Sequence, residues 1–67
     1  MTFEECVKQY NVAIYYDNNK NNMIGTGWFW AVECGYQCFD AHSPKETAAE
    51  AEAELREWLK TWDGPTK

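Results

Sequence analysis

The sequence has little positive charge and no long apolar run, and both shortages limit what the chain can bind. Six of its 67 residues are Lys or Arg against 11 Asp or Glu, which gives a formal net charge of −5 at pH 7. Nucleic acid and anionic membranes are therefore disfavoured as main ligands, because binding to them relies on clustered Lys and Arg. No apolar stretch approaches a membrane span, and the N-terminal residues lack a signal-peptide pattern. We expect a cytoplasmic protein.

Residues that carry catalytic chemistry are also scarce. The sequence holds one His and one Ser, and Ser43 stands where a helix cap is expected. No set of nucleophile, base and orienting group can be assembled from what remains. The carboxylates are expected to face water, where nothing raises their pKa towards neutrality. The sequence therefore predicts a protein that is not an enzyme and needs no cofactor.

Three cysteines are an odd number without secretory context, which favours reduced thiols. Cys34, Cys38 and His42 are spaced by four residues, and Cys6 would complete a Cys₃His zinc set. Zinc ligands of this kind usually come from tight knuckles in loops, whereas this spacing straddles an expected hairpin and leaves the fourth ligand distant. Structural thiols are the preferred interpretation, and no metal is predicted.

The strongest positive signal is an acid-rich amphipathic helix from Ser43 to Trp62. Its predicted start is a capping box between Ser43 and Glu46, with Pro44 at the first helical position. Strong helix formers follow, and the segment 63–65 (Asp-Gly-Pro) ends the helix. One stripe is apolar and is expected to pack on a sheet: Ala48, Ala51, Leu55, Trp58, Leu59 and Trp62.

The opposite stripe of this helix carries four carboxylates: Glu46, Glu50, Glu54 and Glu57. One interpretation is a solvated face that keeps the protein in solution. The other is a negative surface that a basic partner protein contacts, which makes these four residues partner-binding candidates.

Three strands are expected before the helix. The first runs from Tyr10 to Tyr16 and the second from Trp28 to Cys34, separated by an Asn-rich turn cluster over 17–22. A Cys-Gly pair then indicates a two-residue hairpin turn into a third strand from Tyr36 to about Ala41. Residues 1–9 form either a short helix, begun by a weaker capping box, or a direct run into the first strand.

The predicted fold is one small α+β domain over residues 1–67. It has an N-terminal segment (1–9), a three-stranded antiparallel meander (10–42), one long C-terminal helix (43–62) on one sheet face, and a tail (63–67). Phe39 and Ala41 are expected to point to the helix, and Cys38 and Asp40 away from it. A slip of one residue in register would exchange the two faces.

The second sheet face is expected to be more apolar than a solvated face requires. It would carry Ala13, Tyr15, Phe29, Ala31 and Tyr36, and exposed patches of this kind usually mark association sites. Tyr15, Phe29 and Tyr36 are therefore partner-binding candidates, for another protein or for a homodimer through this open face. The alternative is that the N-terminal segment or the loop over 17–27 folds across it.

Part of the chain resembles the HicB-type antitoxin domain. The string over 27–32 (GWFWAV), then Gly35 and Cys38, then the run over 47–59 (TAAEAEAELREWL) carry the resemblance, which covers roughly Asn11 to Leu59. It implies a partial RNase H-like sheet that binds a toxin and self-associates. The family's last strand and DNA-binding extension have no counterpart in this sequence, so the resemblance does not extend to autoregulation.

The expected α-β-β-β-α order and the alanine-rich last helix also resemble the double-stranded RNA-binding domain. That family carries a basic cluster at the start of its last helix. The matching positions here hold Lys45, Glu46, Ala49 and Glu50, so one Lys stands among acids. RNA binding is therefore disfavoured on electrostatic grounds.

The leading functional interpretation is a small, acidic, non-enzymatic protein-binding module that inhibits a partner by covering its basic surface. Antitoxin-like proteins act in this way, as do small phage proteins of the anti-CRISPR type that block host defence enzymes. For the latter, the four helix carboxylates would stand in for phosphates in a basic cleft. The alternative is a nucleic-acid-binding module of the double-stranded RNA-binding type.

Overall fold

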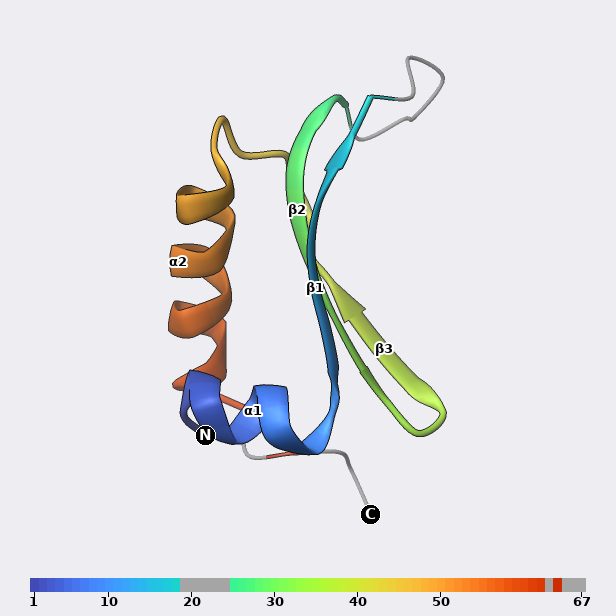
Figure 1. The fold of residues 1–67 in the computed structure, drawn as a ribbon, viewed down its shortest axis with the longest axis vertical. Helices are drawn as coiled ribbons and strands as arrows, with labels where there is room; N and C mark the ends of the chain where they lie inside the picture. Colours follow the sequence, from blue (N-terminus) through green and yellow to red (C-terminus); the bar gives the residue numbers. More distant parts are fainter. Residues whose placement is uncertain (19–24, 63, 65–67) are drawn as a thin grey trace.

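A computed structural model of the chain describes residues 1–18, 25–62 and 64. The elements are α1 (Phe3–Gln9), β1 (Asn11–Asp17), β2 (Gly27–Cys34), β3 (Gln37–Asp40) and α2 (Ala48–Leu59). Figure 1 shows two layers, a sheet and α2 beside it, with α1 near the end of α2. The predicted α+β class is confirmed, while most of the predicted turn cluster and tail lies outside the described residues. Within these ranges, no helix is long and apolar enough to cross a membrane.

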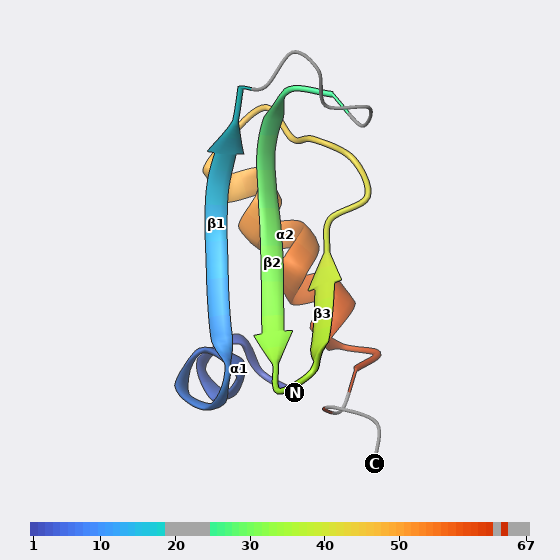
Figure 2. The same cartoon turned by 90° about the vertical axis from the view of Figure 1, so that its right-hand side faces the viewer.

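The sheet is an antiparallel meander in the order β1-β2-β3 (Figure 2). Val12 lies opposite Val32, which in turn lies opposite Phe39 on the third strand. Cys34 pairs with Gln37, so two residues form the turn between β2 and β3. Gly35 opens that turn with φ 62°, the positive value that a type II′ turn requires of its first residue. The predicted two-residue hairpin is confirmed, but its turn residues are Gly35 and Tyr36 instead of Cys34 and Gly35, and β3 begins at Gln37 instead of Tyr36.

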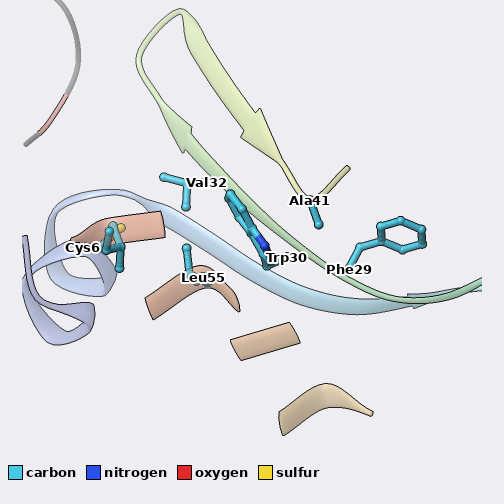
Figure 3. Close-up of a cluster of buried hydrophobic side chains, with 7 residues drawn as sticks. Cys6, Phe29, Trp30, Val32, Ala41 and Leu55 are labelled. Carbon is cyan, nitrogen blue, oxygen red and sulfur yellow. The ribbon is translucent and has the colours of Figure 1, made fainter. Parts of the chain in front are cut away.

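One face of the sheet packs against α2 and forms the core. Side chains alternate along a strand, so the even-numbered residues of β1 and β2 share this face. Figure 3 shows Cys6, Trp30, Val32 and Leu55 gathered between the strands and α2. Ala41 is also buried in this cluster, and the ring of Phe39 packs partly against it. The predicted register, with Phe39 and Ala41 inward, is confirmed.

The C-terminal helix is shorter than predicted, because it begins at Ala48 and ends at Leu59. Its N-cap is Thr47, whose hydroxyl accepts a hydrogen bond from the Glu50 backbone N–H at 3.1 Å. The predicted capping box at Ser43 is therefore wrong. The reason is tertiary: the backbone N–H groups of Trp28 and Lys45 each donate to the other residue's carbonyl at 2.9 Å, which holds the segment before the helix as an isolated strand bridge.

The end of α2 was also predicted too late. The backbone N–H of Thr61 donates to the carbonyl of Trp58 at 3.0 Å, an i−3 bond that replaces the α-helical pattern after Leu59. Trp62 nevertheless keeps its predicted apolar role, because its ring stacks on Trp58 with centroids 4.7 Å apart.

The N-terminal residues form the short helix α1 rather than running directly into the first strand. Thr2 and Glu5 make a complete capping box, with bonds of 3.0 and 3.1 Å between each side chain and the other residue's backbone N–H. The helix places Cys6 in the core at 0% exposure. In Figure 1, α1 lies on the same side of the sheet as α2, so it does not cover the open face.

Candidate functional site

Of the four predicted helix carboxylates, one is bonded to other parts of the fold and three are exposed to solvent. The bonded residue is Glu54. Its Oε1 accepts a hydrogen bond from Trp30 Nε1 at 2.9 Å, and its Oε2 forms an ion pair with Lys45 Nζ at 2.7 Å. The side chain of Glu54 is 32% exposed. It therefore joins α2 to β2 and to the segment that leads from the sheet to α2.

The environment of Glu54 favours its charged form. Partial burial raises its pKa, but the hydrogen bonds from Lys45 and Trp30, together with the charges of Lys45 and His42, bring the pKa below its ordinary value. The carboxylate is thus ionised at neutral pH and occupied by contacts within the chain.

The other three carboxylates are exposed to solvent. Glu50 lies in the first turn of α2, and Glu57 lies in its third turn, where Lys60 contacts it at 3.1 Å with both side chains about 70% exposed. Glu46 lies before the helix, in the connecting segment, instead of on the predicted helical stripe. Glu50, Glu54 and Glu57 do come together, because they line one shallow hollow of about 420 Å³ with Lys45 and Ala53. We call this the acidic hollow.

The described cations are largely paired with these and neighbouring carboxylates. Lys45 pairs with Glu54, Lys60 with Glu57, and Arg56 with Glu52 at 3.2 Å across one helical turn. In the part of the chain that the structure describes, this leaves Lys8 as the one Lys or Arg side chain outside an ion pair. A cluster of free Lys and Arg, as phosphate binding requires, is not formed by these residues.

The open sheet face is less apolar than predicted, because Phe29 is buried. Its ring, 2% exposed, points away from the α2 side of the sheet and stacks on Tyr15 with centroids 5.8 Å apart (Figure 3). Tyr15 is 41% exposed and Tyr36, in the hairpin turn, is 86% exposed. Tyr15 therefore presents surface on this face, with Phe29 beneath it, whereas Tyr36 lies in the turn at the end of the sheet instead of on the predicted strand.

The open face is also acidic. Burial raises the pKa of Tyr15, and the negative charges of Asp40 and Asp17 raise it further. α1 and α2 do not cover this face (Figure 1), and the part of the 17–27 loop over 19–24 lies outside the described residues. A partner of Tyr15 would therefore meet negative charge around an aromatic ring.

The four residues weighed as zinc ligands are not brought together. Cys6 and Cys34 are buried, whereas Cys38 is exposed and its thiol contacts Asp40 Oδ1 at 3.6 Å. Burial raises the pKa of the Cys6 thiol, with a further contribution from Cys34, which disfavours the thiolate that zinc binds. Across the described ranges, no group of three or more His, Cys, Asp or Glu residues is arranged to hold a metal ion.

Sequence reasoning missed a second hollow, beside the free edge of β3. Its lining is mostly apolar and its volume is about 420 Å³, with walls formed by Trp30, Cys38, Phe39, Asp40, Ala41, His42 and Trp58. The rings of Phe39 and Trp58 lie 5.2 Å apart and remain partly exposed there. The sequence did not indicate this hollow, because the third strand was predicted from Tyr36 to about Ala41 and β3 is shorter, from Gln37 to Asp40.

The geometry gives an acidic hollow on α2 and an acidic face around Tyr15, on opposite sides of the molecule. The resemblances to the HicB-type antitoxin and to the double-stranded RNA-binding domain rest on sequence and remain predictions. Comparison of the chain with protein-family models, with curated proteins and with solved structures finds no match.

Proposed function

We propose that the chain is a small acidic protein-binding module that inhibits a partner protein by covering its basic surface. The observation that carries this proposal is the acidic hollow, in which three carboxylates surround one already paired Lys. Lys and Arg side chains of a partner would contact Glu50 and Glu57 directly. Charge complementarity of this kind directs association and selects against acidic partners.

Two biological roles use this chemistry. An antitoxin-like module would neutralise a basic toxin, and a phage protein of the anti-CRISPR type would occupy a cleft that normally holds nucleic acid. In both, the carboxylates of the acidic hollow stand in for phosphates, and Glu46 extends the negative surface beyond the helix. Tyr15 on the open face and Tyr36 in the hairpin turn offer a second contact area, for the same partner or for a homodimer.

The test begins with recovery of the partner from the native host by pull-down and mass spectrometry, followed by binding titrations with the purified partner. The informative variant is Glu50→Lys with Glu57→Lys. We expect it to weaken binding by at least about tenfold, because each reversed charge removes a contact of about 1 kcal/mol or more. Glu54 is left intact because it supports the fold.

The matched control is Glu4→Lys with Glu52→Lys, which makes the same charge change at exposed or half-exposed positions outside both the acidic hollow and the open face. We expect it to change the affinity far less, and circular dichroism should show both variants folded. Equal losses in the two variants would mean that net charge, and not the acidic hollow, governs binding.

The alternative of double-stranded RNA binding makes a different prediction. Lys45, the one basic residue kept at the position of that family's cluster, is engaged by Glu54. Filter binding with a short RNA duplex is therefore expected to show no salt-sensitive, submicromolar retention. Such retention would replace the protein-binding proposal with RNA binding.

A further inference from the structure

β1 is an edge strand without the features that usually protect such an edge. In the order β1-β2-β3, its outer side has no neighbouring strand among the described residues. Figure 2 shows this outer edge open along most of its length, with α1 beside one end. Exposed edges are commonly blocked by charged residues, Pro or bulges. From Tyr10 to Tyr16 the chain has neither Pro nor a charged side chain, so the one charged residue of β1 is Asp17 at its end, and the pairing with β2 is regular.

The hydrogen-bond pattern shows which residues of β1 face outward. Backbone groups of Trp28 bond to Lys45, and the carbonyl of Trp30 accepts from Ala41, so both residues direct their backbone groups away from β1. Because these directions alternate along a strand, Phe29 and Ala31 bond towards β1.

Tyr15 and Ala13 are the partners of Phe29 and Ala31 and therefore bond back to β2. The alternate residues of β1 are Val12, Ile14 and Tyr16. Their backbone N–H and C=O groups consequently point away from β2, in the plane of the sheet, towards its free edge.

We propose that β1 pairs with β1 of a second copy of the chain, antiparallel and centred on Ile14. In this register, Ile14 faces the second copy's Ile14 and Val12 faces its Tyr16, so all three outward residues find hydrogen-bonding partners. All seven residues of each strand are paired. A register centred one position to either side leaves two residues of each strand unpaired. The result is a continuous six-stranded sheet with a two-fold axis through its middle.

The side chains in this register complement one another. Ala13 lies opposite the second copy's Tyr15 in a non-hydrogen-bonded pair, where side chains approach most closely. Both are exposed in the single chain, so the large ring of one copy would cover the small side chain of the other. Asp17 lies opposite the second copy's Asn11, an amide that can donate to the carboxylate. No like charges meet, although each chain carries a net charge of −5. This self-association leaves the acidic hollow, which carries the proposed function, uncovered.

Heterotypic crosslinking tests the register. Two variants are made in a Cys38→Ser background, which removes the exposed native thiol: Ala13→Cys and Tyr15→Cys. Residues in a non-hydrogen-bonded pair have Cα atoms about 4.5 Å apart, within the range of a disulfide. Mixing the two variants under mild oxidation should give mainly the heterodimer, as measured by mass spectrometry without reductant. The control mixture replaces Ala13→Cys with Ala53→Cys, an exposed position on α2.

The alternative registers give different products. Pairing centred on Ala13 would crosslink the Ala13→Cys variant with itself, and pairing centred on Tyr15 would do the same for Tyr15→Cys. Either homodimer as the main product would overturn the proposal, as would a heterodimer yield no higher than that of the control. Light scattering of the unmodified chain should show the mass approaching twice the monomer value between micromolar and millimolar concentration. A monomer throughout that range would also overturn it.

Discussion

At the residue scale, Glu54 was predicted to contact a partner but instead stabilises the fold. One carboxylate oxygen accepts a hydrogen bond from the indole of Trp30 on β2, and the other pairs with the ammonium of Lys45 in the segment before α2. Both contacts favour the charged form, and its pKa is lowered on balance despite partial burial. Because the folded-state pKa is lower than the unfolded value, Glu54 stabilises the fold above the unfolded pKa. That contribution is lost as the pH falls through the folded pKa.

Replacement of Glu54 by Gln is therefore expected to destabilise the protein in a pH-dependent way. At neutral pH the loss should be about 1 kcal/mol, because an ion pair and part of a charge-assisted hydrogen bond are removed. Below about pH 4 the difference from the parent chain should shrink, since the parent's own carboxylate is then becoming protonated. Urea unfolding at several pH values measures both effects. Glu57→Gln, which changes an exposed ion pair, should show almost no difference at either pH.

Gly27 is a second residue with a specific structural requirement. Its φ is 154°, and a Cβ placed there would lie 2.6 Å from Pro44 Cβ and 2.9 Å from the Lys45 carbonyl oxygen. We expect Gly27→Ala to lower the free energy of unfolding by about 1–3 kcal/mol through strain and displacement of the Trp28–Lys45 bridge. Thermal unfolding measures the loss. The comparison variant is Gly35→Asn, since Asn tolerates positive φ and a Cβ at Gly35 meets no atom within 4 Å. A smaller loss at Gly27 than at Gly35 would contradict this account.

At the scale of elements, the start of α2 depends on which residue caps it. Thr47 accepts the bond from the Glu50 N–H, whereas Ser43 lies before the strand bridge and outside the helix. Thr47→Ala should cost about 1 kcal/mol of stability, the usual value for a lost N-cap. Ser43→Ala should change stability by less than about 0.5 kcal/mol, as at ordinary exposed positions. Urea unfolding of both variants distinguishes the two caps. A larger loss of stability for Ser43→Ala than for Thr47→Ala would support the capping box predicted from the sequence.

At the scale of the whole molecule, two short helices and three strands share one small core. α1 contributes Cys6 to that core, and the terminal ammonium of Met1 donates to the Leu59 carbonyl at 3.2 Å, at the end of α2. A domain of this size has about 5 kcal/mol of stability, so loss of one element is enough to unfold it. We expect deletion of residues 1–9 to abolish cooperative urea unfolding and the near-ultraviolet dichroism of the aromatic core.

The control for this deletion is Lys8→Ala, a change on the exposed side of α1. It should leave the unfolding transition within about 0.5 kcal/mol of the parent chain. If the deleted chain instead unfolds cooperatively at a similar urea concentration, α1 is an accessory to the fold and not a part of its core.

The sequence alone predicted the strands, the hairpin and the apolar stripe of α2 because these depend on local signals. Alternating β-branched and aromatic residues, a Gly at a turn and alanine-rich helical periodicity are each read within a few residues. The inward positions of Phe39 and Ala41 followed from the charge of Asp40, which was expected to face solvent and so set the alternation along the third strand. For the candidate site, composition predicted a negative surface but not its geometry.

Three features were decided by tertiary contacts. The start of α2 moved from Ser43 to Ala48 because the Trp28–Lys45 bridge holds the preceding segment extended, although the local sequence favours a helix there. Glu54 became a structural residue because the packing of α2 on the sheet places the Trp30 indole and the Lys45 ammonium next to its carboxylate. Phe29 was buried although it lies on the face away from α2. Local propensity ranks conformations by energies of about 1 kcal/mol or less per residue, and contacts between distant segments are strong enough to override it.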